Sequence, residues 1–307
     1  MRFSIVTATN NSERFLAQTI ESVISQKGDF EIHYVIVDNR STDRTAEIAA
    51  RYQSLLKQRE AGTQSRKVSM EFVSERDDGM YEAINRGFAR SIGDVMAWIN
   101  SDDIYLPGAF AAVSQALLEN PGVAWLKGVT SYIDENSEIP QPGMCNLYDR
   151  RWIEAGFYGP LFAFIQQDSV FWKSSLWDRV GGCDSSLRLS GDYFLWREFA
   201  RFEPLYSLPC YLSCFRRRAA QLSTDMEGYW REAASRDQIP GLGKQRLLAR
   251  GLKSTKLPRV LRLAIRRGFL GTPHYRYLPR PDSEGGSTGR AAHADVIDDR
   301  VTSAVLL

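Results

Sequence analysis

Residues that carry metal or disulfide chemistry are scarce in this chain of 307 residues. It has only 4 cysteines and 3 histidines. The cysteines show neither the Cys-x-x-Cys spacing of a zinc site nor the dense pairing of a small disulfide-rich domain, which indicates a reducing compartment. The histidines form no metal-ligating or catalytic set. These absences exclude zinc modules and small secreted scaffolds.

Long apolar runs are also missing. No run approaches the roughly 20 residues that a membrane-spanning helix needs. The apolar stretch after Met1 is too short for a signal peptide. We therefore expect a cytoplasmic protein that is at most peripheral on the inner face of a membrane.

An excess of charge of either sign is missing from the whole chain. The net charge is +2, and 43% hydrophobic with 25% charged residues is ordinary for a globular protein. Nothing here favours a nucleic-acid partner. Residues 238–281 nevertheless carry 11 Lys and Arg and no Asp or Glu. Within them, Leu257–Phe269 has the pattern of a basic amphipathic helix, which either contacts an anionic membrane or packs its apolar face on the protein.

Strand-like and helix-like segments alternate through the first hundred residues. Short apolar segments at Phe3–Val6, Ile32–Val37, Val68–Phe72 and Val95–Ile99 predict buried strands, and the intervening segments have helical spacing. We expect the polar stretch Gln53–Arg66 to end in a loop. This alternation predicts a parallel sheet, in which ligands bind at the carboxyl ends of strands.

Two adjacent carboxylates follow the fourth predicted strand, in Asn100-Ser101-Asp102-Asp103. Oxygen ligands of this kind suit Mg²⁺ or Mn²⁺, which usually complete their shell with water and substrate phosphates. The pattern therefore fits a metal-bound diphosphate. The alternative is a turn in which Asp102 caps the next helix.

The composition changes along the chain in a way that predicts three regions. Residues 1–225 form the main domain, and residues 226–275 form a basic helical extension. Residues 276–307, which are rich in Gly, Ser, Asp and Ala, are expected to be a disordered tail.

An ordered set of motifs closely resembles the GT-A fold glycosyltransferases of family 2, over roughly Arg2 to Ser223. The resemblance implies an α/β GT-A (nucleotide-diphospho-sugar transferase) fold with a mixed central sheet flanked by helices, followed here by a C-terminal helical extension. The motifs are Val6–Asn10, Val37–Thr45, Glu75–Gly87, Asn100–Asp103, Phe164–Trp172, Val180–Gly182 and Leu189–Trp196.

The resemblance implies a metal-binding role for the acidic motif. Asp103 is expected to be the direct ligand of Mn²⁺ or Mg²⁺, and Asp102 is expected to assist through the ribose or a bound water. Many relatives carry Asp at the position of Asn100. The missing charge predicts that the metal is loosely held without the donor.

The resemblance also implies a nucleotide-binding set. Asp38 is expected to accept a hydrogen bond from the pyrimidine ring, although it could equally be a helix N-terminal partner beside Ser41. Thr9 stands where relatives often place an aromatic side chain. The expected donor-binding residues are Thr7, Thr9, Asp38, Asp78, Asn85 and Asp102.

On the acceptor side, Asp192 matches the catalytic carboxylate of the family and is expected to be the general base. The family motif usually reads Glu-Asp, but Gly191 stands here in the first position. An N-terminal role in the following helix is compatible with catalysis. Gln167 and Trp196 are expected beside the acceptor, although large aromatic residues are more often core. We expect one arginine of Arg216–Arg218 to neutralise the diphosphate.

The sequence thus predicts an inverting, metal-assisted glycosyltransferase. Its donor would be a UDP- or dTDP-sugar, and its acceptor a saccharide or lipid-linked saccharide of a cell-envelope polysaccharide pathway. A nucleotidyltransferase would need a basic phosphate loop near the first strand, and Thr7–Ser12 contains no Lys or Arg. The remaining alternative is a nucleotide-binding but catalytically silent module of a membrane-associated polysaccharide assembly complex.

Overall fold

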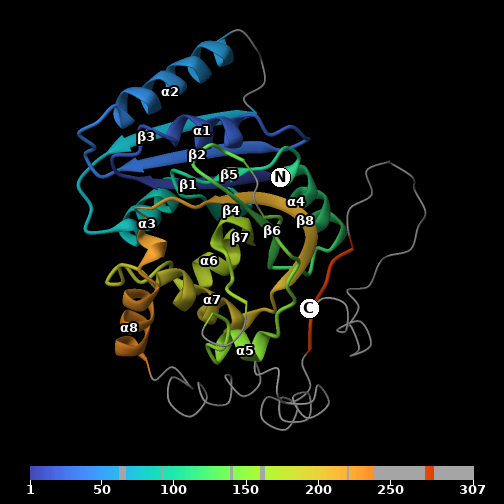
Figure 1. Cartoon of the computed structure of the whole chain (residues 1–307). Coiled ribbons are helices and arrows are strands. Elements are labelled where there is room, and N and C mark those ends of the chain that lie inside the picture. Colours follow the sequence, from blue (N-terminus) through green and yellow to red (C-terminus); the bar gives the residue numbers. More distant parts are fainter. Residues whose placement is uncertain are drawn as a thin grey trace.

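The computed structural model describes residues 1–61, 67–91, 93–138, 141–159, 163–219, 221–237 and 274–279 (Figure 1). Its first half is built from alternating strands and helices, as the apolar periodicity predicts. These elements are β1 (Arg2–Thr9), α1 (Leu16–Ile24), β2 (Glu31–Asp38), α2 (Thr45–Ala61), β3 (Val68–Ser74), α3 (Met80–Arg90) and β4 (Val95–Trp98).

The second half is less regular and contains short strands joined by longer connections. It is made of β5 (Ile104–Tyr105), α4 (Ala109–Glu119), β6 (Trp125–Ile133), α5 (Arg150–Glu154), the 3-10 turn η1 (Gln167–Ser169), β7 (Val170–Lys173), α6 (Ser174–Val180), α7 (Gly191–Phe202), β8 (Tyr206–Arg216), the 3-10 turn η2 (Leu222–Thr224) and α8 (Met226–Arg236).

All eight strands join one mixed sheet in the order β3-β2-β1-β4-β7-β6-β8-β5. β1 pairs in parallel with β2 and β4, and β2 with β3. β7 runs antiparallel to both β4 and β6, and β5 runs antiparallel to β8. The carboxyl ends of β1, β2 and β4 consequently meet at one edge, which is where ligands bind in open α/β sheets.

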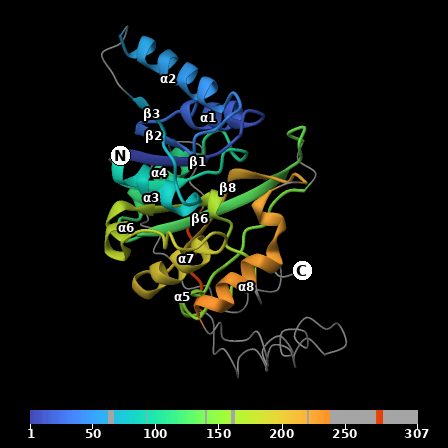
Figure 2. The ribbon, with the colours of Figure 1, turned by 90° about the vertical axis from the view of Figure 1, so that its left-hand side faces the viewer.

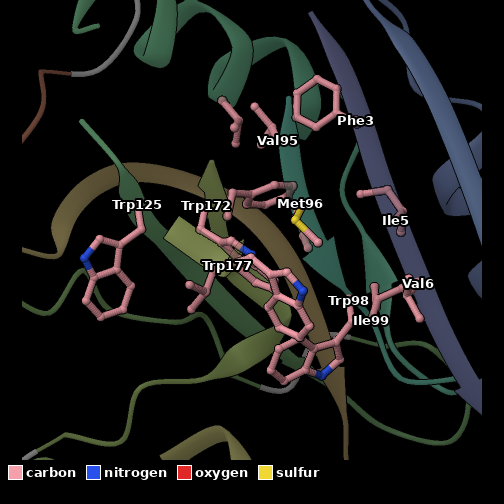
Figure 3. Packing of buried hydrophobic residues seen from close by; sticks show 14 of the residues in the cluster. Phe3, Ile5, Val6, Val95, Met96, Trp98, Ile99, Trp125, Trp172 and Trp177 are labelled. Carbon is pink, nitrogen blue, oxygen red and sulfur yellow. The ribbon is translucent and has the colours of Figure 1, made fainter. Parts of the chain in front are cut away.

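Buried aromatic side chains link the two halves of the sheet. Trp98 on β4 packs edge-on against Trp172 on β7, with ring centroids 5.4 Å apart, and Trp172 stacks on Trp177 of α6 (Figure 3). Trp98, Trp125 and Trp172 are at most 1% exposed. Rings of this size contribute much of the apolar burial that holds β4 against the second half.

Helix α2 continues to Ala61. The polar stretch that starts at Gln53 is therefore helical at first, because its residues are strong helix formers and polarity alone does not end a helix. Residues 62–66, where the loop is expected, lie outside the described residues. Asp102 caps no helix, because α4 begins after Gly108, which has a φ of +83°.

Residues 274–279, where the predicted extension meets the predicted tail, contact the rest of the described chain. Tyr275 and Leu278 are 4% and 0% exposed, and the Leu278 N–H donates to the Ser207 carbonyl at 2.9 Å. These two apolar side chains join the core. The basic segment Leu257–Phe269 lies outside the described residues. Among the helices that the structure describes, none has the length and apolar composition needed to cross a membrane.

Candidate active site

The carboxyl edge of the parallel strands gathers the predicted donor-side residues. The Asn39 N–H donates to the Thr9 carbonyl, and the Ile99 N–H donates to the Val6 carbonyl, each at 3.0 Å. These bonds extend the ladders β1–β2 and β1–β4 beyond the strands. They bring Thr9, Asp38 and the acidic turn Asn100–Asp103 to the same edge.

Asp103 is the buried member of the acidic pair. It is 1% exposed, and both of its oxygens accept hydrogen bonds from the protein. Oδ1 accepts from the Arg216 backbone N–H at 2.7 Å, and Oδ2 accepts from Asn100 Nδ2 at 3.0 Å. Burial, followed by the carboxylates of Asp102 and Asp168, raises the pKa of Asp103 well above its usual range. Asp103 therefore anchors the end of β8 to the acidic turn.

Asp102 is the more open carboxylate of the pair. Its side chain is 15% exposed and pairs with Arg218, whose Nε lies 2.7 Å from Asp102 Oδ2. Arg218 is itself 34% exposed. The positive charge beside Asp102 is thus the guanidinium of Arg218, which follows β8 in the chain. One arginine of this segment is expected from the sequence to contact the diphosphate.

The three consecutive arginines that begin with the last residue of β8 differ in their surroundings. Arg216 is fully buried, and its guanidinium donates to Asp102 O at 2.8 Å and to Gln18 Oε1 at 2.7 Å. Arg217 lies over the ring of Tyr132, 3.8 Å from its centroid. Only Arg218 of these three pairs with a carboxylate of the acidic motif.

Asp38 is fully buried at the end of β2. Its Oδ1 accepts from the Ser41 hydroxyl, and its Oδ2 accepts from the Ser41 N–H at 3.0 Å and Ser74 Oγ at 2.6 Å. The local partner expected beside Ser41 is therefore present. One lone pair of Oδ1 remains beyond these bonds.

Asp77, which sequence reasoning missed, lies near Asp38. The Asp77 N–H donates to Asn39 Oδ1 at 3.2 Å, and Asp77 Oδ1 accepts from the Gly79 N–H at 3.1 Å. Burial first, with the negative charges of Glu82 and Asp38 adding to it, raises the pKa of Asp77. Asp78, the predicted residue, is exposed, and its N–H donates to Glu82 Oε2. The only sequence signal was the repeated Asp before Gly79.

Thr7 and Thr9 have different surroundings although they lie on the same strand. Thr7 Oγ1 donates to the Ile99 carbonyl at 2.8 Å and lies 2.9 Å from the Tyr34 hydroxyl. Thr9 Oγ1 is buried and finds no hydrogen-bond partner among the described residues. Thr7 therefore ties β1 to the acidic turn, whereas Thr9 keeps an unused hydroxyl at the strand end.

Asp192 lies in the first turn of α7 and is 7% exposed. Its Oδ1 accepts from the Tyr229 hydroxyl at 2.7 Å, the Tyr193 N–H at 2.9 Å and the Tyr81 hydroxyl at 3.3 Å. Burial raises the pKa of Asp192 to about 6, although these hydrogen bonds favour the charged form. A carboxylate with a pKa near neutrality is suited to general-base chemistry.

The packing around Gly191 explains why a glycine stands where the family motif usually has glutamate. A Cβ atom placed on Gly191 would lie 2.7 Å from three atoms of the Tyr81 ring. Real Cβ contacts are essentially never that short. Tyr81 therefore occupies the space that a glutamate at position 191 would need.

The turn η1 holds polar groups with few partners. Both amide atoms of Gln167 are buried and without a hydrogen bond in the described part of the chain, as is Asp168 Oδ1. Lys127, 5% exposed, donates to Ser169 Oγ at 3.1 Å, and burial lowers its pKa to about 8. The sequence offered no motif for these two buried charged residues, Lys127 and Asp168.

Two predicted residues lie in structural contacts. Trp196 is 2% exposed and stacks on Trp98, with centroids 5.5 Å apart and an interplanar angle of 8°. Asn85 makes two hydrogen bonds with the Cys183 backbone, at 2.8 and 2.9 Å.

The residues present fit a divalent cation that is shared with a ligand. In the described residues, no three His, Cys, Asp or Glu side chains are arranged to hold a metal by themselves. Asp102 and Asp103 supply oxygen atoms only, and the Thr9 hydroxyl nearby is unpartnered. Mg²⁺ and Mn²⁺ are commonly held by one or two carboxylates together with water and substrate phosphates. The donor set matches that type of site.

Comparison with known proteins identifies the family of this chain. Residues 4–179, more than half of the chain, match the family described as Glycosyl transferase family 2. The chain belongs to this family. Both the family and the mixed α/β GT-A fold expected from the sequence are thus confirmed.

Curated relatives of this family 2 chain are distant. An uncharacterized glycosyltransferase of Rickettsia typhi is 24% identical over 208 residues, which cover 66% of this chain and 60% of the relative. The PGL/p-HBAD biosynthesis glycosyltransferase of Mycobacterium bovis is 31% identical over 120 residues, covering 38% of this chain and 42% of the relative. The match thus spans 60% of the first relative's length and 42% of the second's.

Solved structures share the fold. Staphylococcus aureus TarS 1–349, in complex with UDP-GlcNAc, superposes with a TM-score of 0.56 at 16% identity, over 88% of this chain and 72% of that one. The mannosyltransferase PcManGT of Pyrobaculum calidifontis, in complex with GDP-Man and Mn²⁺, gives a TM-score of 0.50 at 17% identity, over 87% and 68%. At such identities, the likeness extends to the fold alone.

Proposed function

We propose that this chain transfers a sugar from a nucleotide-diphosphate donor to a hydroxyl of a saccharide or lipid-linked saccharide, with inversion at the anomeric carbon. The observation that carries the proposal is the combination of an acidic pair at the end of β4 with a buried carboxylate, Asp192, whose pKa is raised to about 6. Family membership supports the same reaction class.

The donor would bind across the carboxyl ends of β1, β2 and β4. Asp38 and Asp77 would face the nucleoside, and the unpartnered Thr9 hydroxyl would gain a hydrogen bond there. We favour UDP or dTDP because a carboxylate acceptor suits the N3–H of uracil or thymine. The UDP-GlcNAc and UDP in the TarS complexes are consistent with that preference.

Asp102 is the better candidate for direct contact with the metal. Its carboxylate is 15% exposed, whereas Asp103 is 1% exposed with both oxygens hydrogen-bonded. When bound, the cation would neutralise charge on the departing nucleoside diphosphate. Arg218, now paired with Asp102, would be free to contact the diphosphate once the cation is in place.

On the acceptor side, Asp192 would remove the proton of the attacking hydroxyl. Three donors hold Oδ1, so Oδ2 is the oxygen left to receive that proton. Inversion follows because the nucleophile and the leaving group would lie on opposite faces of the sugar.

Calorimetry of UDP, dTDP and GDP with and without Mn²⁺, on wild type, Asp102→Asn and Asp103→Asn, tests the donor site. We expect metal-dependent binding of UDP or dTDP that is strongly weakened in Asp102→Asn. Failure of the folded protein to bind any of the three contradicts the proposal. Binding without turnover of any donor sugar would instead favour the catalytically silent module.

A further inference from the structure

Helix α8 contacts the proposed base although it lies beyond the family match and beyond the predicted domain boundary at residue 225. It begins at Met226 and packs beside α7 (Figure 2). Tyr229 on its first turns is 8% exposed and donates to Asp192 Oδ1 at 2.7 Å. The base is therefore held from an element that no catalytic motif of the sequence includes.

The two tyrosines at Asp192 are not equivalent donors. Each hydroxyl has one proton to donate. The Tyr81 hydroxyl lies 2.9 Å from the Leu189 carbonyl and 3.3 Å from Asp192 Oδ1, so its proton is shared or directed toward Leu189. The Tyr229 hydroxyl lies 2.7 Å from Asp192. Tyr229 is thus the principal side-chain donor to the carboxylate.

A second contact fixes α8 against the turn that leads into α7. The Glu232 carboxylate accepts from the backbone N–H groups of Arg188, Leu189 and Ser190 at 2.7 to 2.9 Å, and from Ser190 Oγ at 2.7 Å. Burial raises the pKa of Glu232, but these hydrogen bonds outweigh it and leave the pKa lowered. An anion that takes three N–H groups of one turn defines where α7 starts, and with it where Asp192 sits.

We propose that Tyr229 is a positioning residue for the base, holding Asp192 Oδ1 so that Oδ2 faces the acceptor hydroxyl, and that α8 belongs to the catalytic unit. This inference rests on the proposed role of Asp192. A hydrogen bond to the charged form of a carboxyl lowers its pKa, so Tyr229 also keeps more of Asp192 ionised at neutral pH.

Tyr229→Phe removes the hydroxyl and keeps the ring. We expect the acidic limb of kcat/KM for donor turnover to move about one pH unit higher, because a hydrogen bond to a charged group is worth about that much in pKa. Activity at high pH should return toward the wild-type level. Tyr81→Phe should move the limb less. Tyr211→Phe is the matched control, since the Tyr211 hydroxyl contacts Gly143 and the residue is 51% exposed.

Carbon-13 NMR of aspartate-labelled protein provides a readout that needs no turnover. The Asp192 carboxyl signal is assigned by its loss in Asp192→Asn, and its titration is followed in wild type and Tyr229→Phe. A higher pKa of Asp192 in Tyr229→Phe than in wild type supports the hydrogen bond from Tyr229. This result would stand even if the protein turned over no donor, since the lack of turnover would count only against the proposed function. An unchanged titration, or an acidic limb that does not follow the NMR shift, overturns the positioning role.

Discussion

Asn100 donates its side-chain amide to Asp103 Oδ2 at 3.0 Å. An aspartate at position 100 could not make this bond, because an ionised carboxylate only accepts. The hydrogen bond from Asn100 thus offsets part of the free-energy cost of burying the Asp103 carboxyl group, and it comes from the same turn. The position at which this chain departs from many relatives therefore stabilises the acidic turn when no cation is bound.

In Asn100→Asp, the stability of the acidic turn Asn100–Asp103 should depend on a bound metal ion. It replaces a hydrogen bond by repulsion between two carboxylates, and we expect the protein to lose about 2 kcal/mol of unfolding free energy without metal. Millimolar Mn²⁺ should restore more of the thermal midpoint in Asn100→Asp than in wild type. Thermal unfolding with and without Mn²⁺ measures this; equal Mn²⁺ responses in the two proteins would contradict it.

The strands and the site edge could be predicted, because apolar runs end at polar residues in a regular way. Asp38, Asp102, Asp103 and Asp192 all lie at the strand or helix ends expected of them. Their individual surroundings could not be predicted. Which of two adjacent carboxylates is buried depends on Arg216, more than 100 residues further along the chain.

Asp192→Asn should slow turnover strongly and leave nucleotide binding intact. An amide cannot take the proton of the acceptor, so we expect kcat to fall by about 10²- to 10⁴-fold. In wild type, kcat/KM should fall below pH 6, because the pKa of Asp192 is about 6 and the base must be ionised. Steady-state kinetics from pH 5 to 8 measures both effects. Near-normal turnover by Asp192→Asn would remove Asp192 from the mechanism.

The same substitution should stabilise the fold at neutral pH. The pKa of Asp192 is higher in the folded state than in the unfolded chain, so ionising it costs stability as pH rises from about 4 to about 6. Asp192→Asn removes this cost and should gain up to about 3 kcal/mol at pH 7, but little near pH 4. Urea unfolding at both pH values tests the prediction, which a loss of stability at pH 7 would contradict.

Substitution of Arg216 should mainly reduce the stability of the fold, whereas substitution of Arg218 should mainly weaken nucleotide binding. Arg216→Ala leaves the buried acceptors Asp102 O and Gln18 Oε1 without their donor, and we expect a loss of about 3 kcal/mol or more. Arg218 is one-third exposed, so Arg218→Ala should cost at most about 1 kcal/mol. It should nevertheless weaken nucleoside-diphosphate binding. Equal stability losses in the two variants would argue against this division.

Restoring the family's acidic residue at position 191 should impair the site. In Gly191→Glu the new Cβ would meet the Tyr81 ring at 2.7 Å, so the ring must move away from Asp192. We expect lower turnover and a loss of about 1–3 kcal/mol from overpacking. Gly181→Ala is a useful control, because a Cβ at Gly181 meets nothing within 4 Å and tests backbone strain alone. Wild-type turnover in Gly191→Glu would refute the steric account.

Tyr229 shows why part of the site lay beyond sequence reasoning. Its partner Asp192 is 37 residues away, and Met226–Arg236 has no motif beyond a polar helical pattern. Trp196 illustrates a different difficulty. Its helical spacing fits both a side chain beside the acceptor and a side chain in the core, so the pattern alone does not choose between them. Its stacking on Trp98 follows only from the tertiary packing of α7 under β4.

The chain is fastened on both sides of residues 238–273. Asp237 Oδ2 pairs with Arg197 at 2.7 Å, and the His274 N–H donates to Asp149 Oδ2 at 2.6 Å. Residues 237 and 274 are thus both held by the same described body. A chain that ended before residue 274 would lose the N–H donor to the Ser207 carbonyl and the buried side chain of Leu278. The six described residues 274–279 therefore complete the core from a place far along the chain.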